Sequence, residues 1–259
     1  MSFHVLRFNR AASRYESQAG IQSRMAAKLL ELWNEPAPDK ILELGCGTAL
    51  LTRRLRERFP SASILATDAA PAMLVEARKR CGGSGDGRLA FAELDARGNV
   101  PGAKEVLSAS PFKMVCSNAL VQWFPNLEIH LRFVSNLVGN DGMCLLSGFT
   151  HSNFPELNEL LSEPPFSYRD FPGHDSEDVE KTAGNAGWNV SVLYAWEEKE
   201  ILPSAHDVLR RIQALGSSRD PHSGGLLNRK NLEWLTSEYT RRFSEGGGVR
   251  LTWKPWIAL

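Results

Sequence analysis

Short apolar runs alternate with amphipathic stretches along the first 150 positions of the chain. The short apolar runs predict buried strands, and the amphipathic stretches between them predict helices. The predicted strands span 40–45, 63–68, 88–95, 112–117 and 142–149. The predicted helices span 49–59, 71–81 and 126–138, after an N-terminal helix near 20–34 that follows a mobile arm. This alternation is typical of an α/β fold in which helices cover both faces of a mainly parallel sheet.

Two local signals support these boundaries. Pro71 suits the first turn of its helix, because the N–H that proline lacks would have no intrahelical partner there. Asn140-Asp141-Gly142 predicts a turn before the fifth strand.

The pattern changes beyond position 150. A polar stretch at 151–175 leads to a helix near 176–186, and alternation from 188 to 202 predicts one long strand. A last strand is predicted at 249–257. Between these two strands, helices are expected near 205–215 and 228–243, around a Gly/Ser-rich loop at 216–225.

The first predicted strand delivers a glycine turn to a helix. The segment reads Ile41-Leu42-Glu43-Leu44-Gly45-Cys46-Gly47-Thr48. Glycines in such a turn let the backbone approach an adenosine-containing cofactor closely. Asp68 ends the second strand, 21 positions after Gly47 (from 47 to 68), where a carboxylate can bind ribose hydroxyls.

The residue at position 50 helps to distinguish a dinucleotide from other adenosine-containing cofactors. A dinucleotide fingerprint needs a third glycine there, and the chain has Leu50. With no pyrophosphate to hold, S-adenosylmethionine is the better candidate. A Gly-x-Gly turn by itself is also found in ordinary strand-to-helix connections.

Two more carboxylates favour S-adenosylmethionine. Glu43 lies inside an apolar strand, where an unpartnered carboxylate is costly, and the methionyl ammonium would be a partner. Asp95, at the end of the third strand, can accept from the adenine amine while Met73 covers the ring. The alternative for Asp95 is a cap on the following turn.

The fourth strand ends in polar and aromatic residues. Ser117 and Asn118 lie at the carboxyl edge of the sheet, and Gln122 and Trp123 follow within about one turn. An aromatic face attracts a sulfonium cation by about 0.5–2 kcal/mol. The alternative for Trp123 is a core position, which is the usual outcome for a lone Trp.

Composition excludes several classes of protein. The 259 residues include 30 basic and 30 acidic side chains, so no overall charge attracts nucleic acid. The four cysteines form no C-x-x-C pair, which argues against a zinc site or a redox dithiol. No apolar run approaches the length of a membrane span. We expect a cytoplasmic monomer without metal, nucleic acid or membrane partners.

A set of segments spread over nearly the whole chain is similar to one known family. They are Phe8-Asn9-Arg10-Ala11-Ala12-Ser13-Arg14-Tyr15, Gln22, the Gly45-Cys46-Gly47 turn, Asp68 with Met73-Leu74, Ser117 to Trp123, Phe149-Thr150 and Pro155-Glu156-Leu157. In these segments the chain resembles the malonyl-acyl-carrier-protein O-methyltransferases of biotin synthesis, which are class I methyltransferases. The resemblance continues weakly through Leu209 to Gly216 and Leu251-Thr252-Trp253. Ala49 and Leu50, and the segments 97–111 and 151–176, depart from the family pattern.

The resemblance implies a fold and a set of site residues. The fold is a Rossmann-like, seven-stranded, mainly parallel sheet with an antiparallel C-terminal strand and a helical insertion before that last strand. The implied cofactor-binding residues are Glu43, Gly45, Cys46, Gly47, Asp68, Ala69, Met73, Asp95, Ala96 and Ser117. The implied substrate-binding residues are Tyr15, Asn118, Gln122 and Trp123.

The resemblance also implies a reaction, an early step of biotin (pimeloyl) synthesis. Its methyl acceptor is the free carboxylate of a malonyl thioester on acyl carrier protein or coenzyme A. This carboxylate is already ionised at neutral pH, so we expect positioning residues and no catalytic acid or base. Tyr15 would act from an arm that folds over the cofactor.

Basic residues provide several candidates for anion binding. Arg10, Arg14, Arg169 and Arg219 are alternatives for orienting the malonyl carboxylate. The pairs Arg210-Arg211, Arg229-Lys230 and Arg241-Arg242 could meet an acidic carrier protein or could be solvated helix faces.

Other functions remain as alternatives. Another small-molecule class I methyltransferase, acting on a carboxylate or a different acceptor, would share the cofactor half and differ in its loops. A non-catalytic binding module of the same fold would have lost the cofactor carboxylates, yet Glu43, Asp68 and Asp95 are present. Leu50 disfavours a dehydrogenase, and the neutral charge disfavours a nucleic-acid methyltransferase.

We expect one domain over residues 1–259. Its parts are an arm and helix (1–35), a cofactor-binding core (36–150), a C-terminal part of the sheet (151–202 and 249–259) and a helical insertion on the substrate side (203–248).

Overall fold

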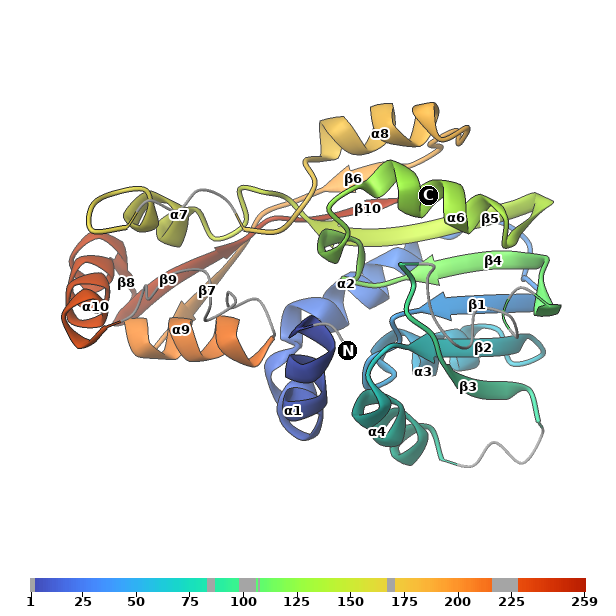
Figure 1. Ribbon diagram of the computed structural model, residues 1–259, viewed down its shortest axis with the longest axis horizontal. Coiled ribbons are helices and arrows are strands. Elements are labelled where there is room, and N and C mark those ends of the chain that lie inside the picture. Colours follow the sequence, from blue (N-terminus) through green and yellow to red (C-terminus); the bar gives the residue numbers. More distant parts are fainter. Residues whose placement is uncertain (1–2, 83–86, 98–105, 107, 167–170, 216–227) are drawn as a thin grey trace.

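Seven strands form one sheet, which runs through the right-hand part of Figure 1. The strands are β1 (Lys40–Leu44), β2 (Ser63–Asp68), β3 (Leu89–Glu93), β4 (Phe112–Ser117), β5 (Val138–Phe149), β6 (Leu193–Ala195) and β10 (Pro255–Ala258). Their order is β3-β2-β1-β4-β5-β10-β6. β10 is antiparallel to β5 and β6, and the pairings from β3 through to β5 are parallel. The predicted mainly parallel sheet with an antiparallel C-terminal strand is confirmed.

The computed structural model describes residues 3–82, 87–97, 106, 108–166, 171–215 and 228–259. Within these ranges, no helix combines the length and the hydropathy that crossing a membrane requires.

Helices cover both faces of the seven-stranded sheet. One face carries α2 (Gly20–Glu31), α3 (Leu50–Arg58) and α4 (Pro71–Cys81), and the other carries α6 (Leu127–Ser135) and α8 (Ser176–Asn185). Side chains alternate along β1, so Ile41 packs with α2 and α3, whereas Leu42 and Leu44 pack with α6 and α8. All three side chains are fully buried. Burial on both faces explains why the strands of a parallel sheet are almost continuously apolar.

A second, three-stranded antiparallel sheet lies at the left of Figure 1. Its order is β7-β9-β8, formed by β7 (Glu198–Leu202), β8 (Ser244–Glu245) and β9 (Gly248–Trp253). Helices α7 (Pro155–Leu161), α9 (Ala205–Ala214) and α10 (Arg229–Phe243) pack against it. Phe154, Tyr239 and Trp253 are the largest buried side chains of this second core. The two helices predicted within 203–248 are confirmed as α9 and α10.

The prediction of single strands at 188–202 and 249–257 is wrong. The first run supplies β6 to one sheet and β7 to the other, and the second run supplies β9 and then β10. The chain changes sheets at Lys254, whose N–H donates to Asn153 Oδ1 (2.8 Å) and not to a strand. Pro255 follows and has no N–H to donate. Alternation continues through this break, so the pattern alone looks like one strand.

The prediction of a mobile N-terminal arm is also wrong. Residues Phe3–Gln18 form helix α1, which lies between α4 and α9 in Figure 1 and contacts both. Asn9 Oδ1 accepts from the Ala72 N–H (2.9 Å) at the start of α4. Glu16 pairs with Arg53 (2.5 Å) and with Arg80 (2.9 Å). These contacts come from residues far away in sequence, and they stabilise a helix whose isolated form would be marginal.

The segment Asn140-Asp141-Gly142 lies inside β5 and is not a turn before it. The pairing of β4 with β5 is irregular between Phe112 and Met114, and this irregularity takes up the extra residues. A Cβ on Gly142 would lie 2.9 Å from the Phe112 carbonyl oxygen. The glycine therefore serves a close approach of two strands.

Candidate active site

The glycine turn after β1 has the backbone conformation that its sequence predicts. Gly45 (φ 69°) and Gly47 (φ 54°) both lie in the left-handed region. A Cβ on Gly45 would meet the Leu120 side chain at 2.8 Å, whereas a Cβ on Gly47 would point into open space. Ala49 also has a positive φ (70°), a conformation that costs a non-glycine residue about 1–2 kcal/mol.

Asp68, the last residue of β2, connects two loops of the site. Its Oδ2 accepts from the Gly47 N–H (2.9 Å), and its Oδ1 accepts from the Ala70 N–H (2.8 Å). Burial raises the pKa of Asp68 to about 6, although these backbone hydrogen bonds act to lower it. A carboxylate has about four acceptor positions, so Asp68 can still accept hydrogen bonds from a ligand in the cavity.

Glu43 lies behind the glycine turn on the side of α3. Its Oε2 accepts from the Thr52 hydroxyl (2.6 Å), and its side chain is 1% exposed. Burial raises the pKa of Glu43 to about 8, the Thr52 hydrogen bond lowers it, and the nearby charge of Asp68 raises it further.

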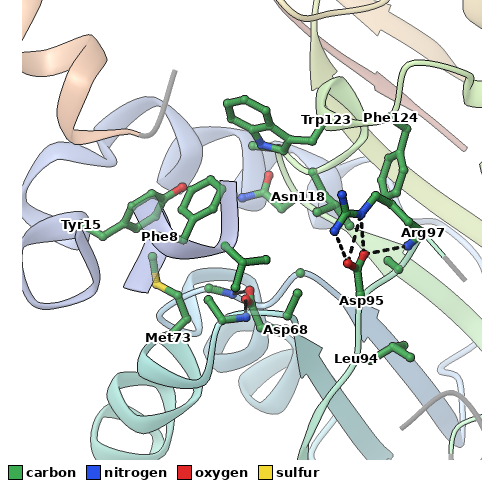
Figure 2. A pocket seen from close by; sticks show the side chains of 18 residues that line it. Phe8, Tyr15, Asp68, Met73, Leu94, Asp95, Arg97, Asn118, Trp123 and Phe124 are labelled. Atoms are coloured by element: carbon green, nitrogen blue, oxygen red, sulfur yellow. Dashed lines mark hydrogen bonds and ion pairs between the residues drawn. The ribbon is translucent and has the colours of Figure 1, made fainter. Parts of the chain in front are cut away.

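Helix α1 supplies one wall of the cavity in front of the turn. Val5, Phe8 and Tyr15 line it from one face of the helix. The Phe8 ring stands edge-to-face against Trp123 (centroids 5.7 Å apart) and lies 6.3 Å from Tyr15 (Figure 2). Burial and the charge of Asp68 raise the pKa of Tyr15 well above its ordinary value. Three aromatic rings therefore gather across the cavity from Asp68.

The segment after β4 supplies the part of the lining next to α1. The Asn118 amide donates to the Gln22 carbonyl (3.0 Å), and its Oδ1 accepts from the Ser147 hydroxyl (2.8 Å). Gln122 donates to the Ala119 carbonyl (2.7 Å), where Ala119 has a φ of 53°. Asn118 is thus fixed in orientation, and Gln122 supports the turn that carries it.

Asp95 faces the cavity from the end of β3, next to Arg97 (Figure 2). The Arg97 Nε lies 2.8 Å from Asp95 Oδ1, and the Arg97 Nη2 also donates to Oδ2. Burial acts to raise the pKa of Asp95, but the hydrogen bonds and charge of Arg97 bring it below the ordinary value. Asp95 is therefore an ionised acceptor at neutral pH.

The cavity measures about 780 Å³, including the part open to solvent. The structure brings ten of the predicted residues to its lining: Tyr15, Gly45, Gly47, Asp68, Ala69, Met73, Asp95, Ala96, Asn118 and Trp123. The other four are not among the lining residues: Glu43, Cys46 and Ser117, which are buried, and Gln122, which is partly buried.

Eight lining residues were not predicted as site residues. They are Val5, Phe8, Ala70, Leu94, Arg97, Ala119, Leu120 and Phe124. The spacing of Val5, Phe8, Ala12 and Tyr15 is that of a helical stripe, which was available in the sequence. No pattern in the sequence marks Arg97 as a lining residue.

The arginines proposed for the malonyl carboxylate lie elsewhere. Arg10 and Arg14 line a groove on the opposite side of α1. Arg169 and Arg219 lie outside the described residues. Arg97 is the arginine that lines the cavity among the described residues, and it is paired with Asp95.

The strand order, the antiparallel β10, the glycine turn and Asp68 together define a class I methyltransferase. Residues 42–144 match the family model described as a methyltransferase domain. A Bacillus halodurans protein assigned to the methyltransferases superposes with a TM-score of 0.62 at 17% identity, covering 90% of this chain and 96% of its own. Phosphoethanolamine N-methyltransferase 2 of Haemonchus contortus, in complex with S-adenosyl-L-methionine, gives 0.51 at 15% identity, covering 91% and 52%.

Sequence relatives narrow the class to a family. A protein of Halorhodospira halophila is 30% identical over 246 residues, covering 93% of this chain and 80% of the relative. A protein of Paenibacillus sp. is 28% identical over 267 residues, covering 97% and 95%. Both are named malonyl-[acyl-carrier protein] O-methyltransferase. The chain belongs to this family of S-adenosylmethionine-dependent methyltransferases, as its resemblance indicated.

We expect the substitution Asp68→Asn to weaken S-adenosylmethionine binding roughly 10- to 100-fold, the effect of losing hydrogen bonds to a charged group. Isothermal titration calorimetry measures this change. Asp141→Asn, at an exposed aspartate of β5, is the matched control and should bind normally. Unchanged affinity in Asp68→Asn would remove the ribose-binding role.

Glu43 should make stability depend on pH. Its folded pKa of about 8 exceeds the ordinary value of 4.5, so the folded state binds more protons between these limits. Stability should therefore fall as pH rises from about 4.5 to 8, by up to roughly 1.4 kcal/mol per pH unit. Denaturant unfolding of Glu43→Gln at pH 5 to 8 should show a flatter slope than wild type. Glu57→Gln, on the exposed face of α3, should keep the wild-type slope.

Proposed function

We propose that this protein transfers a methyl group from S-adenosylmethionine to the free carboxylate of a malonyl thioester held on acyl carrier protein. The observation that carries the proposal is a single cavity with two kinds of lining (Figure 2). Asp68 and Asp95 offer carboxylates to a nucleoside, and aromatic and amide side chains form a wall beside them. The family relatives, named for this reaction, support the substrate. The proposal retains the expectation of a cytoplasmic monomer that does not bind nucleic acid.

The residues present fit the cofactor. Asp68 has spare acceptor positions for ribose hydroxyls, and Asp95 has an ionised carboxylate for the adenine amine. Met73 and Leu94 give the lining apolar surface for a ring face. Gly45 and Gly47 keep the backbone after β1 free of side chains.

The cofactor supplies an electrophilic methyl group, and the carboxylate supplies the nucleophilic oxygen. A carboxylic acid of pKa about 4 is ionised at neutral pH, so the site needs no general base. The oxygen–methyl bond forms as the methyl–sulfur bond breaks, and no proton moves. The protein's contribution is alignment and exclusion of water.

Different side chains exclude water, attract the sulfonium cation and orient the acceptor. Phe8 and Tyr15 cover the cavity from α1, which limits the access of water. Trp123 presents an aromatic ring whose attraction for a cation is about 0.5–2 kcal/mol. Asn118, held by Gln22 and Ser147, offers a rigid amide edge to the acceptor.

Methyl-labelled S-adenosylmethionine, supplied with malonyl, succinyl and acetyl thioesters, tests the substrate assignment. We expect label transfer to the malonyl thioester and none to the acetyl thioester, which has no free carboxylate. The succinyl thioester measures how strictly the site selects chain length. Cofactor binding without methylation of any of the three would contradict the proposal and favour another acceptor.

The role of Trp123 can be tested by comparing the affinities of two ligands that differ in the charge on sulfur. Trp123→Leu should weaken binding of S-adenosylmethionine, whose sulfonium is cationic, about 2- to 30-fold. Binding of S-adenosylhomocysteine, whose thioether sulfur is neutral, should remain almost unchanged. Titration of both ligands measures the two affinities, and S-adenosylhomocysteine serves as the internal control. Equal weakening of both would indicate a packing role without cation recognition.

A further inference from the structure

A groove runs between α1 and α9, on the side of α1 that faces away from the cavity. Its empty volume is about 1610 Å³, including the part open to solvent. The lining residues from α1 are Arg7, Arg10, Ala11, Arg14, Ser17 and Gln18. None of these lines the cofactor cavity, to which α1 contributes Val5, Phe8 and Tyr15. One helix therefore separates two sites.

The groove is strongly basic. Arg7, Arg10 and Arg14 of α1 face Arg210 and Arg211 of α9, and Asp207 is the acidic residue among the lining. The chain as a whole carries no net charge, so this is a local concentration of positive charge. Such concentration costs repulsion unless an anionic partner is present.

Two arginines at the mouth of the groove are available to a partner. Arg10 and Arg14 are exposed, and within the described ranges no carboxylate lies at ion-pair distance from either guanidinium. Arg210 pairs with Asp207 (2.8 Å) but keeps 73% of its side chain exposed.

The walls of the groove are held at a fixed spacing. Arg211 pairs with Glu200 of β7 (2.8 Å) and donates to the Gln18 carbonyl at the end of α1 (3.3 Å). This side chain ties α9 both to the second sheet and to α1. The groove is therefore built by the fold and does not depend on the positions of loose surface side chains.

The charges are distributed along a line. Positions 7, 10 and 14 form a stripe on one helix face, about 10 Å long at 1.5 Å per residue. A single phosphate would be met by donors converging on one point. A row of separated guanidinium groups instead matches a row of carboxylates on a protein surface.

We propose that the groove between α1 and α9 docks an acidic face of the acyl carrier protein that delivers the malonyl thioester. This inference rests on the proposed function, because it names the protein that presents the substrate. Docking places the carrier against one face of α1 while the opposite face covers the cavity. The two faces of α1 would thus contact the carrier protein and the cofactor cavity, which fixes the position of one relative to the other.

Charge reversal tests the docking site. The variant Arg10→Glu/Arg14→Glu should weaken binding of a purified bacterial holo-acyl carrier protein at least about tenfold, measured by fluorescence anisotropy at low salt. Its KM for the malonyl carrier protein should rise similarly. Its KM for malonyl-coenzyme A and its affinity for S-adenosylmethionine should remain within about twofold of wild type, which also shows that the variant is folded.

A matched variant controls for net charge. Lys113→Glu/Lys181→Glu makes the same change of charge at two exposed lysines on β4 and α8, away from the groove, and should bind the carrier normally. High salt should reduce wild-type affinity and narrow the difference between the two double variants.

Three results would overturn the docking site. They are wild-type carrier affinity in the groove variant, equal weakening in the lysine control, or equal loss toward carrier protein and coenzyme A, which would indicate a phosphate subsite instead. A wild-type protein that binds the carrier but methylates no malonyl thioester would overturn the proposed function and leave the docking site supported. A wild-type protein that methylates malonyl-coenzyme A but does not bind the carrier would overturn only the docking site.

Discussion

The two hydrogen bonds accepted by Asp68 hold together the loops at the carboxyl edge of the sheet, where the cavity lies. One comes from Gly47 after β1 and the other from Ala70 before α4, so a single carboxylate fixes two neighbouring loops. Asn9 of α1 in turn accepts from Ala72 in the first turn of α4. The position of the aromatic wall therefore depends on the same short segment. Burial raises the pKa of Asp68 to about 6, and its ionised form still predominates at neutral pH.

Helix α1 serves as a wall shared by two binding surfaces. Its apolar face, with Phe8 and Tyr15, forms one wall of the cavity, and its arginine face borders the groove against α9. Glu16 anchors the helix through ion pairs with Arg53 and Arg80. A methyltransferase of this design needs no proton-transfer group for a carboxylate acceptor. It needs a closed cavity and a way to position the substrate, and α1 contributes to both.

Much of the central fold could be predicted because its signals are local. Strands β2 and β4 and helix α4 span the predicted residues 63–68, 112–117 and 71–81. The cavity also collects most of the predicted site residues, since the carboxyl ends of parallel strands meet at one edge of the sheet. Phe8 and Arg97 were missed. Phe8 lies in the stretch for which the sequence predicts a mobile arm, and the pairing of Arg97 with Asp95 leaves no periodic pattern.

By itself the sequence determined the alternation of strands and helices between residues 40 and 149, the glycine turn and the carboxylate that faces it. These features follow from periodicity, backbone conformation and spacing, which act over a few residues. Only the tertiary structure decided that the chain crosses between two sheets at Lys254, that residues 3–18 form a helix, and that this helix separates a cavity from a basic groove. Each of these depends on contacts between residues far apart along the chain, whose free energies no local pattern contains.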